Sequence, residues 1–283
     1  MASGSCLCGT VRYEVTGPFN AMVSCHCSMC RKQHGSGFAT YVSAPIAQFR
    51  LIAGEDAIMG YQSSEQGTRY NCKVCGSVVP MVMPRHGLVV VPAGPLEGDL
   101  GITPQAHLFV GSKAPWYTIN DSLPQHAEYP PEYGMAGQVR PQVEAREGVT
   151  AGSCLCGEVA FEATGPAMFM QNCHCTRCRR ARAAAHASNI FYKASQFRWL
   201  RGEDLIDEYK VPEAVRYTAS FCRKCGGAVP RIYRERDVAV IPAGSLDTDP
   251  PLRPQRHIFT ANKASWFEIM DSAPQFPEAP PPL

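Results

Sequence analysis

Alternating apolar and polar positions mark two segments at corresponding places in the chain. Residues 10–15 and residues 158–163 have the two-residue period of a β-strand that buries one face. Further runs rich in β-branched and aromatic residues, bounded by Gly, Pro or Ser, cover residues 38–42, 49–52, 78–83 and 88–91. Helices are expected to be few and short, with the best candidates at residues 28–32 and 176–180. The pattern therefore predicts a mainly β protein with largely antiparallel sheets.

The second half of the chain repeats the first. Cys30 matches Cys178 at an offset of 148 residues, and Cys72 matches Cys222 at an offset of 150. Because solenoid repeats have periods of only ~20 to 50 residues, we interpret the repeat as two tandem domains, 1–128 and 152–283. Residues 129–151 contain several Pro and Gly residues, lack apolar periodicity and are predicted to form a linker. A duplicated chain commonly reproduces the contact of a homodimer, so we expect the two domains to pack as an intramolecular pseudo-dimer.

Charge and hydropathy exclude several classes of protein. The formal net charge is +2 and no block of Lys or Arg is present, so nucleic acid is not an expected partner. No run approaches the ~18 apolar residues that a membrane span needs, so no membrane association is expected. The first residues lack the basic start and apolar core of a secretory signal, which predicts a cytoplasmic, reducing environment.

Fourteen cysteines are the unusual feature of the composition, and each half holds seven. An odd number leaves one thiol over in any disulfide scheme confined to one half. Adjacent C-x-C and C-x-x-C pairs are instead a common layout for metal thiolates, and the ion they favour is zinc. The spacing therefore predicts a zinc protein.

Seven cysteines divide naturally into a set of four and a set of three. A closed structural zinc site takes four ligands, whereas a reactive site takes three and leaves one position for water or a substrate thiol. The predicted structural sites are Cys6, Cys8, Cys72 and Cys75 in the first half, and Cys154, Cys156, Cys222 and Cys225 in the second. The predicted open sites are Cys25, Cys27 and Cys30, and Cys173, Cys175 and Cys178. Up to two Zn²⁺ ions per domain are thus expected.

The three-cysteine sets leave alternatives open. His26 or His174 could complete a closed site, or the three thiols could stay reduced without metal; we interpret both histidines as core or supporting residues. His107, His257, Trp116 and Trp266 are expected in the packing, the tryptophans in the core or a pocket. Lys113, Lys263, Arg31, Lys32, Arg179 and Arg180 are either partners for a carboxylate-bearing ligand or solvated surface charge.

Several motifs together resemble a known family. They are Gly4-Ser5-Cys6-Leu7-Cys8-Gly9, Cys25-His26-Cys27-Ser28-Met29-Cys30-Arg31-Lys32, Cys72-Lys73-Val74-Cys75-Gly76 and Pro92-Ala93-Gly94, with matching segments in the second half. This set resembles the glutathione-dependent formaldehyde-activating enzyme (Gfa) family, which includes centromere protein V. The resemblance implies a zinc-stapled β fold similar to that of methionine-R-sulfoxide reductases. It also implies a four-cysteine structural zinc and a second zinc, on the C-x-C-x-x-C cluster, that engages glutathione.

The reaction implied by the resemblance joins glutathione and formaldehyde into S-hydroxymethylglutathione, and family members are classed as carbon-sulfur lyases for the reverse cleavage. A zinc with an open position suits this chemistry, because a coordinated thiol loses its proton and becomes a nucleophile. A noncatalytic zinc module that binds small thiols or protein partners is the alternative. A thiol redox protein is a third hypothesis, weakened because cysteines bound to zinc are poor resolving thiols.

The two copies differ after the three-cysteine motif. Gly35 and Gly37 follow Cys30 and would permit close approach of a ligand, whereas residues 183–185 of the second copy are alanines that favour a longer helix. The first copy is therefore expected to be the more active. Arg31 and Lys32 are its expected contacts for the carboxylates of glutathione.

Overall fold

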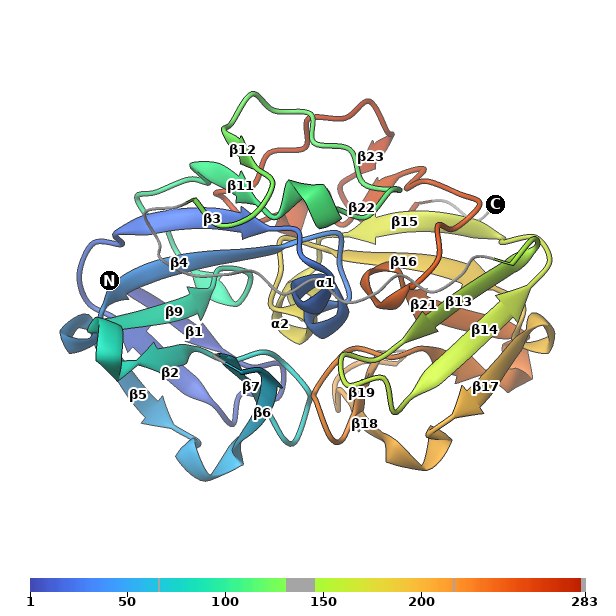
Figure 1. Ribbon diagram of the computed structural model, residues 1–283, viewed down its shortest axis with the longest axis horizontal. Helices are drawn as coiled ribbons and strands as arrows, with labels where there is room; N and C mark the ends of the chain where they lie inside the picture. The colour runs from blue at the N-terminus through green and yellow to red at the C-terminus, as the bar shows by residue number, and fades with distance from the viewer. Residues whose placement is uncertain (66, 131–145, 216, 281–283) are drawn as a thin grey trace.

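The computed structural model describes residues 1–65, 67–130, 146–215 and 217–280. Two sheet-rich halves lie side by side, and the short helices α1 (Ser28–His34) and α2 (Thr176–Arg182) lie between them at the centre of the molecule (Figure 1). No helix among these residues is long and apolar enough to cross a membrane.

Three sheets make up the first half. The four-stranded sheet has the order β10 (Leu96–Glu97), β1 (Ala2–Ser5), β2 (Arg12–Val15) and β5 (Phe49–Ala53). The six-stranded sheet has the order β12 (Gln125–His126), β11 (Ala106–Leu108), β3 (Ala21–Cys25), β4 (Ala39–Pro45), β9 (Leu88–Pro92) and β8 (Met81–Met83). The two-stranded sheet pairs β6 (Ile58–Ser64) with β7 (Gly67–Cys72).

The second half repeats this arrangement. Its three-stranded sheet has the order β13 (Val149–Ser153), β14 (Ala160–Thr164) and β17 (Phe197–Arg201). Its six-stranded sheet has the order β20 (Arg231–Tyr233), β21 (Val238–Pro242), β16 (Ala187–Tyr192), β15 (Phe169–Cys173), β22 (His257–Ile258) and β23 (Gln275–Phe276). The remaining pair is β18 (Ile206–Lys210) with β19 (Thr218–Cys222). Most pairs are antiparallel, but β11 and β22 each run parallel to both of their neighbours.

The prediction of a mainly β protein with few short helices is confirmed. The alternation in residues 10–15 becomes β2, where Tyr13 and Val15 are buried and Arg12 is exposed. Residues 78–83 form a strand only at their end, as β8, since Pro80 has no amide hydrogen for a ladder bond. The likeness to methionine-R-sulfoxide reductases and the domain boundaries stay predictions. Within the predicted linker, residues 131–145 lie outside the described residues, and β13 begins at Val149.

The expectation of a longer second helix is wrong. Both α1 and α2 span seven residues, and α2 ends at Arg182 because the next residue, Ala183, has a left-handed φ of 49°. Gly35 occupies the same place in the first half, with φ of 60°. The alanines after α2 are small because they pack closely: Ala184 and Ala185 are buried against the first half. Tertiary packing overrides the helix propensity of alanine here.

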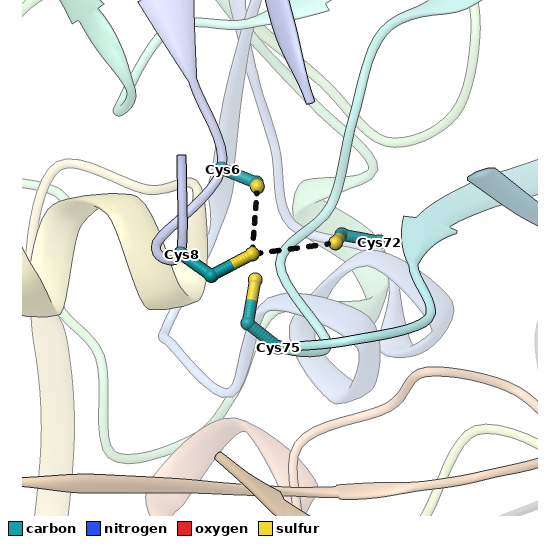
Figure 2. A group of neighbouring side chains, drawn as sticks. All are labelled: Cys6, Cys8, Cys72 and Cys75. Atoms are coloured by element: carbon teal, nitrogen blue, oxygen red, sulfur yellow. Dashed lines mark hydrogen bonds between the residues drawn. The ribbon is translucent and has the colours of Figure 1, made fainter. Parts of the chain in front are cut away.

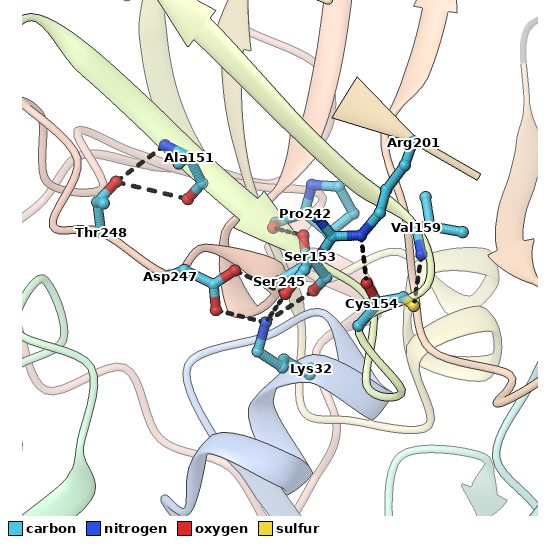
Figure 3. A network of polar contacts seen from close by, with 11 residues as sticks. Lys32, Ala151, Ser153, Cys154, Val159, Arg201, Pro242, Ser245, Asp247 and Thr248 are labelled. Atoms are coloured by element: carbon cyan, nitrogen blue, oxygen red, sulfur yellow. Dashed lines mark hydrogen bonds and ion pairs between the residues drawn. The ribbon is translucent and has the colours of Figure 1, made fainter. Parts of the chain in front are cut away.

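Ion pairs cross between the halves at corresponding positions. In Figure 3 the ammonium of Lys32 on α1 lies 2.6 Å from an Asp247 carboxylate oxygen and donates to the carbonyl and hydroxyl oxygens of Ser153 at 2.8 and 2.7 Å. Arg180 on α2 pairs with Glu97 of the first half. Lys32 is 4% exposed, so this pair is shielded from solvent far more than a surface salt bridge.

The repeated Pro-Ala-Gly segment also joins the halves. A Cβ on Gly244 would lie 2.3 Å from the carbonyl oxygen of Arg31 and 2.4 Å from the amide nitrogen of Ser36. A Cβ on Gly94 would lie 2.3 Å from the amide nitrogen of Ala184. Each glycine therefore allows its turn to approach the end of the opposite half's helix, where any side chain would clash with backbone.

We predict that Gly244→Ala lowers the free energy of unfolding by about 2 kcal/mol, because backbone atoms must move to admit the methyl group. Denaturant unfolding measures this change. Gly60→Ala is the matched control: its Cβ would meet only side-chain atoms, the nearest at 3.2 Å, so its effect should stay within about 0.5 kcal/mol. Equal stability of the two variants would contradict the close contact at Gly244.

Candidate zinc sites and the surrounding pockets

Four cysteine side chains converge at the end of the first sheet. Cys6 and Cys8 follow β1, Cys72 is the last residue of β7, and Cys75 lies on the turn after it. Cys6 Sγ lies 3.4 Å from Cys8 Sγ, which lies 3.8 Å from Cys72 Sγ, and the four sulfurs lie within 4.8 Å of one another (Figure 2). Backbone bonds from Cys72 to Ser77 and from Gly76 to Cys72 hold the turn.

The second half brings its four cysteines together in the same way. Cys154 and Cys156 follow β13, Cys222 ends β19, and the Sγ distances are 3.4 Å between Cys154 and Cys156 and 3.8 Å between Cys156 and Cys222. Cys225 completes the group. In both halves the cluster ties the loop after the first strand of that half to a distant hairpin, which is a typical use of a structural metal in a small β fold.

The three-cysteine clusters form where a strand turns into a helix. Cys25 ends β3, Cys27 caps α1, and Cys30 lies in its first turn, with its amide donating to Cys27 Sγ at 3.3 Å. The equivalent bond from Cys178 to Cys175 measures 3.4 Å. Hydrogen bonds from the thiols of Cys173 and Cys178 lower the pKa of Cys175 to about 3. Each three-cysteine set lies within 4.8 Å, a spacing at which one ion could bind all three sulfurs.

These clusters fit zinc. Tetrahedral coordination with Zn–S bonds of ~2.3 Å requires sulfurs roughly 3.8 Å apart. The Sγ separations of 3.4 and 3.8 Å in the four-cysteine clusters are close to this spacing. Buried thiolates without carboxylates suit a soft ion better than calcium or magnesium.

His26 and His174 bind other side chains. His26 Nε2 lies 2.8 Å from His107 Nδ1, and His107 Nε2 lies 3.0 Å from both oxygens of Asp121. Burial, reinforced by His107, lowers the pKa of His26 to about 3, so its ring is neutral at pH 7. His174, His257 and Asp271 form the same chain. This agrees with the interpretation of both histidines as supporting residues.

The His–Asp pairs of both halves face one cleft of about 260 Å³. His107 and Asp121 line it together with His257 and Asp271, and Trp266 contributes an aromatic wall. Trp116 and Trp266 are both buried, as predicted. His107 and His257 stand out in the sequence as repeated residues, but the cleft does not, because residues of both halves line it.

Bulky side chains cover the first three-cysteine cluster. Both terminal nitrogens of Arg69 lie 3.6 Å from Cys30 Sγ, and one donates to Gln33 Oε1 at 2.9 Å. The hydroxyl of Tyr41 lies 3.8 Å from the same sulfur, and Tyr129 packs against the buried core that contains the three cysteines and lies near enough for them to raise its pKa. Burial alone would lower the pKa of Arg69, but Cys30, Tyr41 and Cys27 raise it well above its usual value. No motif within one copy of the sequence predicts this cover.

The second cluster instead adjoins a small cavity of about 50 Å³. Cys178, Arg182, Tyr217 and Arg231 line it. Burial lowers the pKa of Arg182, and the neighbouring Arg231 lowers it further, while Tyr217 and Cys178 raise it.

Most of the other predicted ligand contacts have partners inside the protein, and Arg31 is the exception among the described residues. All three ammonium protons of Lys32 have acceptors, in Ser153 and Asp247. Arg31 Nε is buried without a partner in the described part of the chain. Arg179 donates to the Gly94 carbonyl, and Lys113 and Lys263 donate to carbonyls of their own half. Gly35 and Gly37 approach protein atoms of Ala228 and Tyr117.

The family profile described as "Glutathione-dependent formaldehyde-activating enzyme" matches residues 1–112 and 149–262. The chain belongs to this family. Both matched segments contain one four-cysteine and one three-cysteine cluster, which agrees with the resemblance seen in the motifs.

Two individual proteins are similar to parts of this Gfa-family chain. A Halomonas elongata protein named "Putative glutathione-dependent formaldehyde-activating enzyme" is 32% identical over 130 residues, which cover 42% of this chain and 81% of the relative. A Rhodobacter sphaeroides protein of known crystal structure is 26% identical in sequence, with a TM-score of 0.29. The match covers 36% of this chain and 97% of the Rhodobacter chain.

Acid should destabilise the wall of the first cluster through His34. His34 Nδ1 donates to the Arg182 carbonyl at 2.7 Å, its Nε2 accepts from the Tyr41 hydroxyl at 2.8 Å, and burial lowers its pKa from 6.5 to about 4. Below pH 6.5 the unfolded chain takes up this proton and the folded protein does not. The stability contribution is therefore complete above pH 6.5 and falls as the pH drops towards 4, by up to ~1.4 kcal/mol per pH unit.

We predict that the free energy of unfolding of His34→Gln decreases less steeply than that of the parent between pH 6.5 and about 5. The difference in slope should be at most ~1.4 kcal/mol per pH unit, the value for one proton. Denaturant unfolding at several pH values measures the slope, and metal loss in acid affects variant and parent alike. His86→Gln, at an exposed position, should leave the slope unchanged. If the stability of His34→Gln depends on pH as steeply as that of the parent, His34 is already protonated in the folded protein.

Proposed function

We propose that this protein is a zinc-dependent carbon-sulfur lyase that forms or cleaves S-hydroxymethylglutathione. The observation that carries the proposal is the pair of three-cysteine clusters, each of which would supply three of the four ligands of a zinc ion, in a chain of the glutathione-dependent formaldehyde-activating family. Cys25, Cys27 and Cys30, with Cys173, Cys175 and Cys178, are the proposed reactive ligands. The four-cysteine clusters are the proposed structural sites, giving up to two Zn²⁺ ions per half.

The reaction needs a thiolate and a path for one proton. Zinc at a three-cysteine cluster would lower the pKa of a bound glutathione thiol, and three cysteine thiolates make the ion better suited to deliver a thiolate than to activate water. The sulfur then bonds to the carbonyl carbon of formaldehyde, and the oxygen takes up a proton in place of the one that the thiol lost. Cleavage reverses these steps. Cysteines that must stay reduced support a cytoplasmic location.

We further propose that the halves behave as an intramolecular pseudo-dimer. The support comes from the paired positions of their contacts: Lys32 with Asp247 and Arg180 with Glu97, and Gly244 and Gly94 each against the opposite helix end. The stability loss expected for Gly244→Ala tests this proposal.

Zinc in the four-cysteine cluster should hold the first half folded. We predict that Cys72→Ser removes one zinc ion and unfolds that half, because structural zinc binding supplies ~10 kcal/mol of folding free energy. Metal analysis and thermal unfolding measure both effects. Thr10→Ala, which removes only a hydroxyl 3.2 Å from Cys8 Sγ, should keep the metal and the melting temperature. Parental metal content and melting in Cys72→Ser would rule out the structural site.

Turnover tests the proposed lyase directly. We predict that the zinc-loaded protein accelerates exchange between free formaldehyde and its glutathione adduct, which ¹³C exchange NMR measures at equilibrium. The double variant Cys27→Ala/Cys175→Ala should lose the acceleration while keeping the zinc of its four-cysteine clusters. Exchange at the uncatalysed rate with fully loaded parent protein would contradict the proposal.

A further inference from the structure

Three positions that cover the first cluster carry smaller residues in the second. At the offsets set by the repeat, Tyr41 corresponds to Asn189, Arg69 to Ala219 and Tyr129 to Ala279. Arg69 and Ala219 occupy the same register in their hairpins, opposite Tyr61 and Tyr209. Two aromatic rings and a guanidinium are thus replaced by an amide and two methyl groups.

The first cluster is closed by this cover. Arg69 is held from three sides, by Cys30 Sγ, by Gln33 Oε1 and by Ser63 Oγ, to which its Nε donates at 3.1 Å. Tyr41 is held by its bond to His34. A ligand thiol would have to displace a paired guanidinium and a bonded phenol to reach the cluster, and both groups would lose their partners.

At the second cluster the space that Arg69 fills in the first copy belongs to a cavity, although Tyr217 lies beside Cys178 and its hydroxyl donates to the Arg177 carbonyl at 3.2 Å. The cavity of about 50 Å³ has Cys178 in one wall and Ala219 and Asn189 in others. Two polar atoms of its lining residues are buried without a hydrogen-bond partner in the described part of the chain: Asn189 Oδ1 and Arg231 Nε. Unpaired buried groups are costly, and a bound ligand can satisfy them.

The charge around this cavity favours an anion. Arg182 and Arg231 both line it, none of the described lining residues is acidic, and neither arginine forms an ion pair within the described ranges. The guanidinium of Arg231 instead lies 4.5 Å from the centre of the Tyr233 ring. Two neighbouring cations that form no ion pair with a carboxylate repel each other, so a carboxylate placed between them would be stabilised.

We propose that the second three-cysteine cluster is the ligand site of this chain and binds a thiol that carries a carboxylate, with its sulfur towards Cys178 and its carboxylate towards Arg182 and Arg231. The first cluster is closed by Arg69. This inference rests on the proposed function, since it assumes a metal that accepts a thiol. It also makes the second copy, and not the first, the one that binds the ligand, contrary to the expectation drawn from Gly35 and Gly37. A cavity of about 50 Å³ admits a thiol and a few attached atoms. The rest of a glutathione-sized ligand must lie over the surface.

Cobalt-substituted protein tests this without relying on turnover, because visible absorption reports a new thiolate on Co²⁺ while closed four-cysteine sites do not respond. Glutathione should change the spectrum with one binding event per chain. Ala219→Arg, which places the first copy's cover on the second, should weaken binding about tenfold or more. Val215→Arg, at a 90% exposed position on the same segment, adds the same charge and should not. Arg69→Ala should add a second binding event.

A second variant keeps the proposal testable if Ala219→Arg fails to fold or loses metal. Arg231→Gln should weaken glutathione binding severalfold and leave the binding of uncharged 2-mercaptoethanol unchanged. An equal effect of Arg231→Gln on both thiols would overturn the carboxylate contact.

The remaining outcomes separate this inference from the proposed function. If Cys27→Ala abolishes glutathione binding and Ala219→Arg does not weaken it, the ligand binds at the first cluster and only the inference fails. If mercaptoacetate binds and Ala219→Arg blocks it while glutathione never binds, the site stands and the glutathione reaction fails. If neither thiol changes the spectrum, both are overturned.

Discussion

The close approach of each Pro-Ala-Gly turn to the opposite helix end is the contact on which the rest of the molecule depends. Gly94 and Gly244 bring backbone against backbone, which fixes where α1 and α2 lie between the halves. Those helices begin at the three-cysteine clusters, so the contact also fixes where the sulfurs face. The cleft lined by His107 and His257 exists because the halves meet in this way.

Within that framework, side-chain volume at a few positions decides what each cluster can do. The sulfur geometry of the two halves is nearly the same, with equal Sγ separations in the four-cysteine clusters. The cover differs: Arg69 lies against Cys30 in the first copy, whereas Ala219 in the second lines a cavity that Tyr217 borders. Metal binding and ligand access are thus set by different residues. The residues that bind the metal are alike in the two copies, whereas those that control ligand access differ.

Local patterns in the sequence were enough to predict the β content, the repeat and the grouping of the cysteines into fours and threes, because period-two alternation and C-x-C spacing act over a few residues. Properties that depend on contact between distant segments could not be predicted. Lys32 has the charge of a ligand contact, yet its partner Asp247 comes from the other half. The alanines after α2 have high helix propensity, but they are small because Gly94 lies against them. Aligning Arg69 with Ala219 would have hinted at unequal clusters, although not at which one is open.

Carrying both halves on one chain allows the molecule to break its own symmetry. In a dimer of identical chains, every substitution appears twice, so an arginine that covers one cluster would cover both. Here Arg69 occurs once, and its counterpart is free to be Ala219. The unlike ion pairs, Lys32 with Asp247 and Arg180 with Glu97, have the same consequence. Each half therefore has contact residues that fit the other half and not a second copy of itself. Duplication in one chain thus allows the two clusters to differ, which identical subunits cannot do.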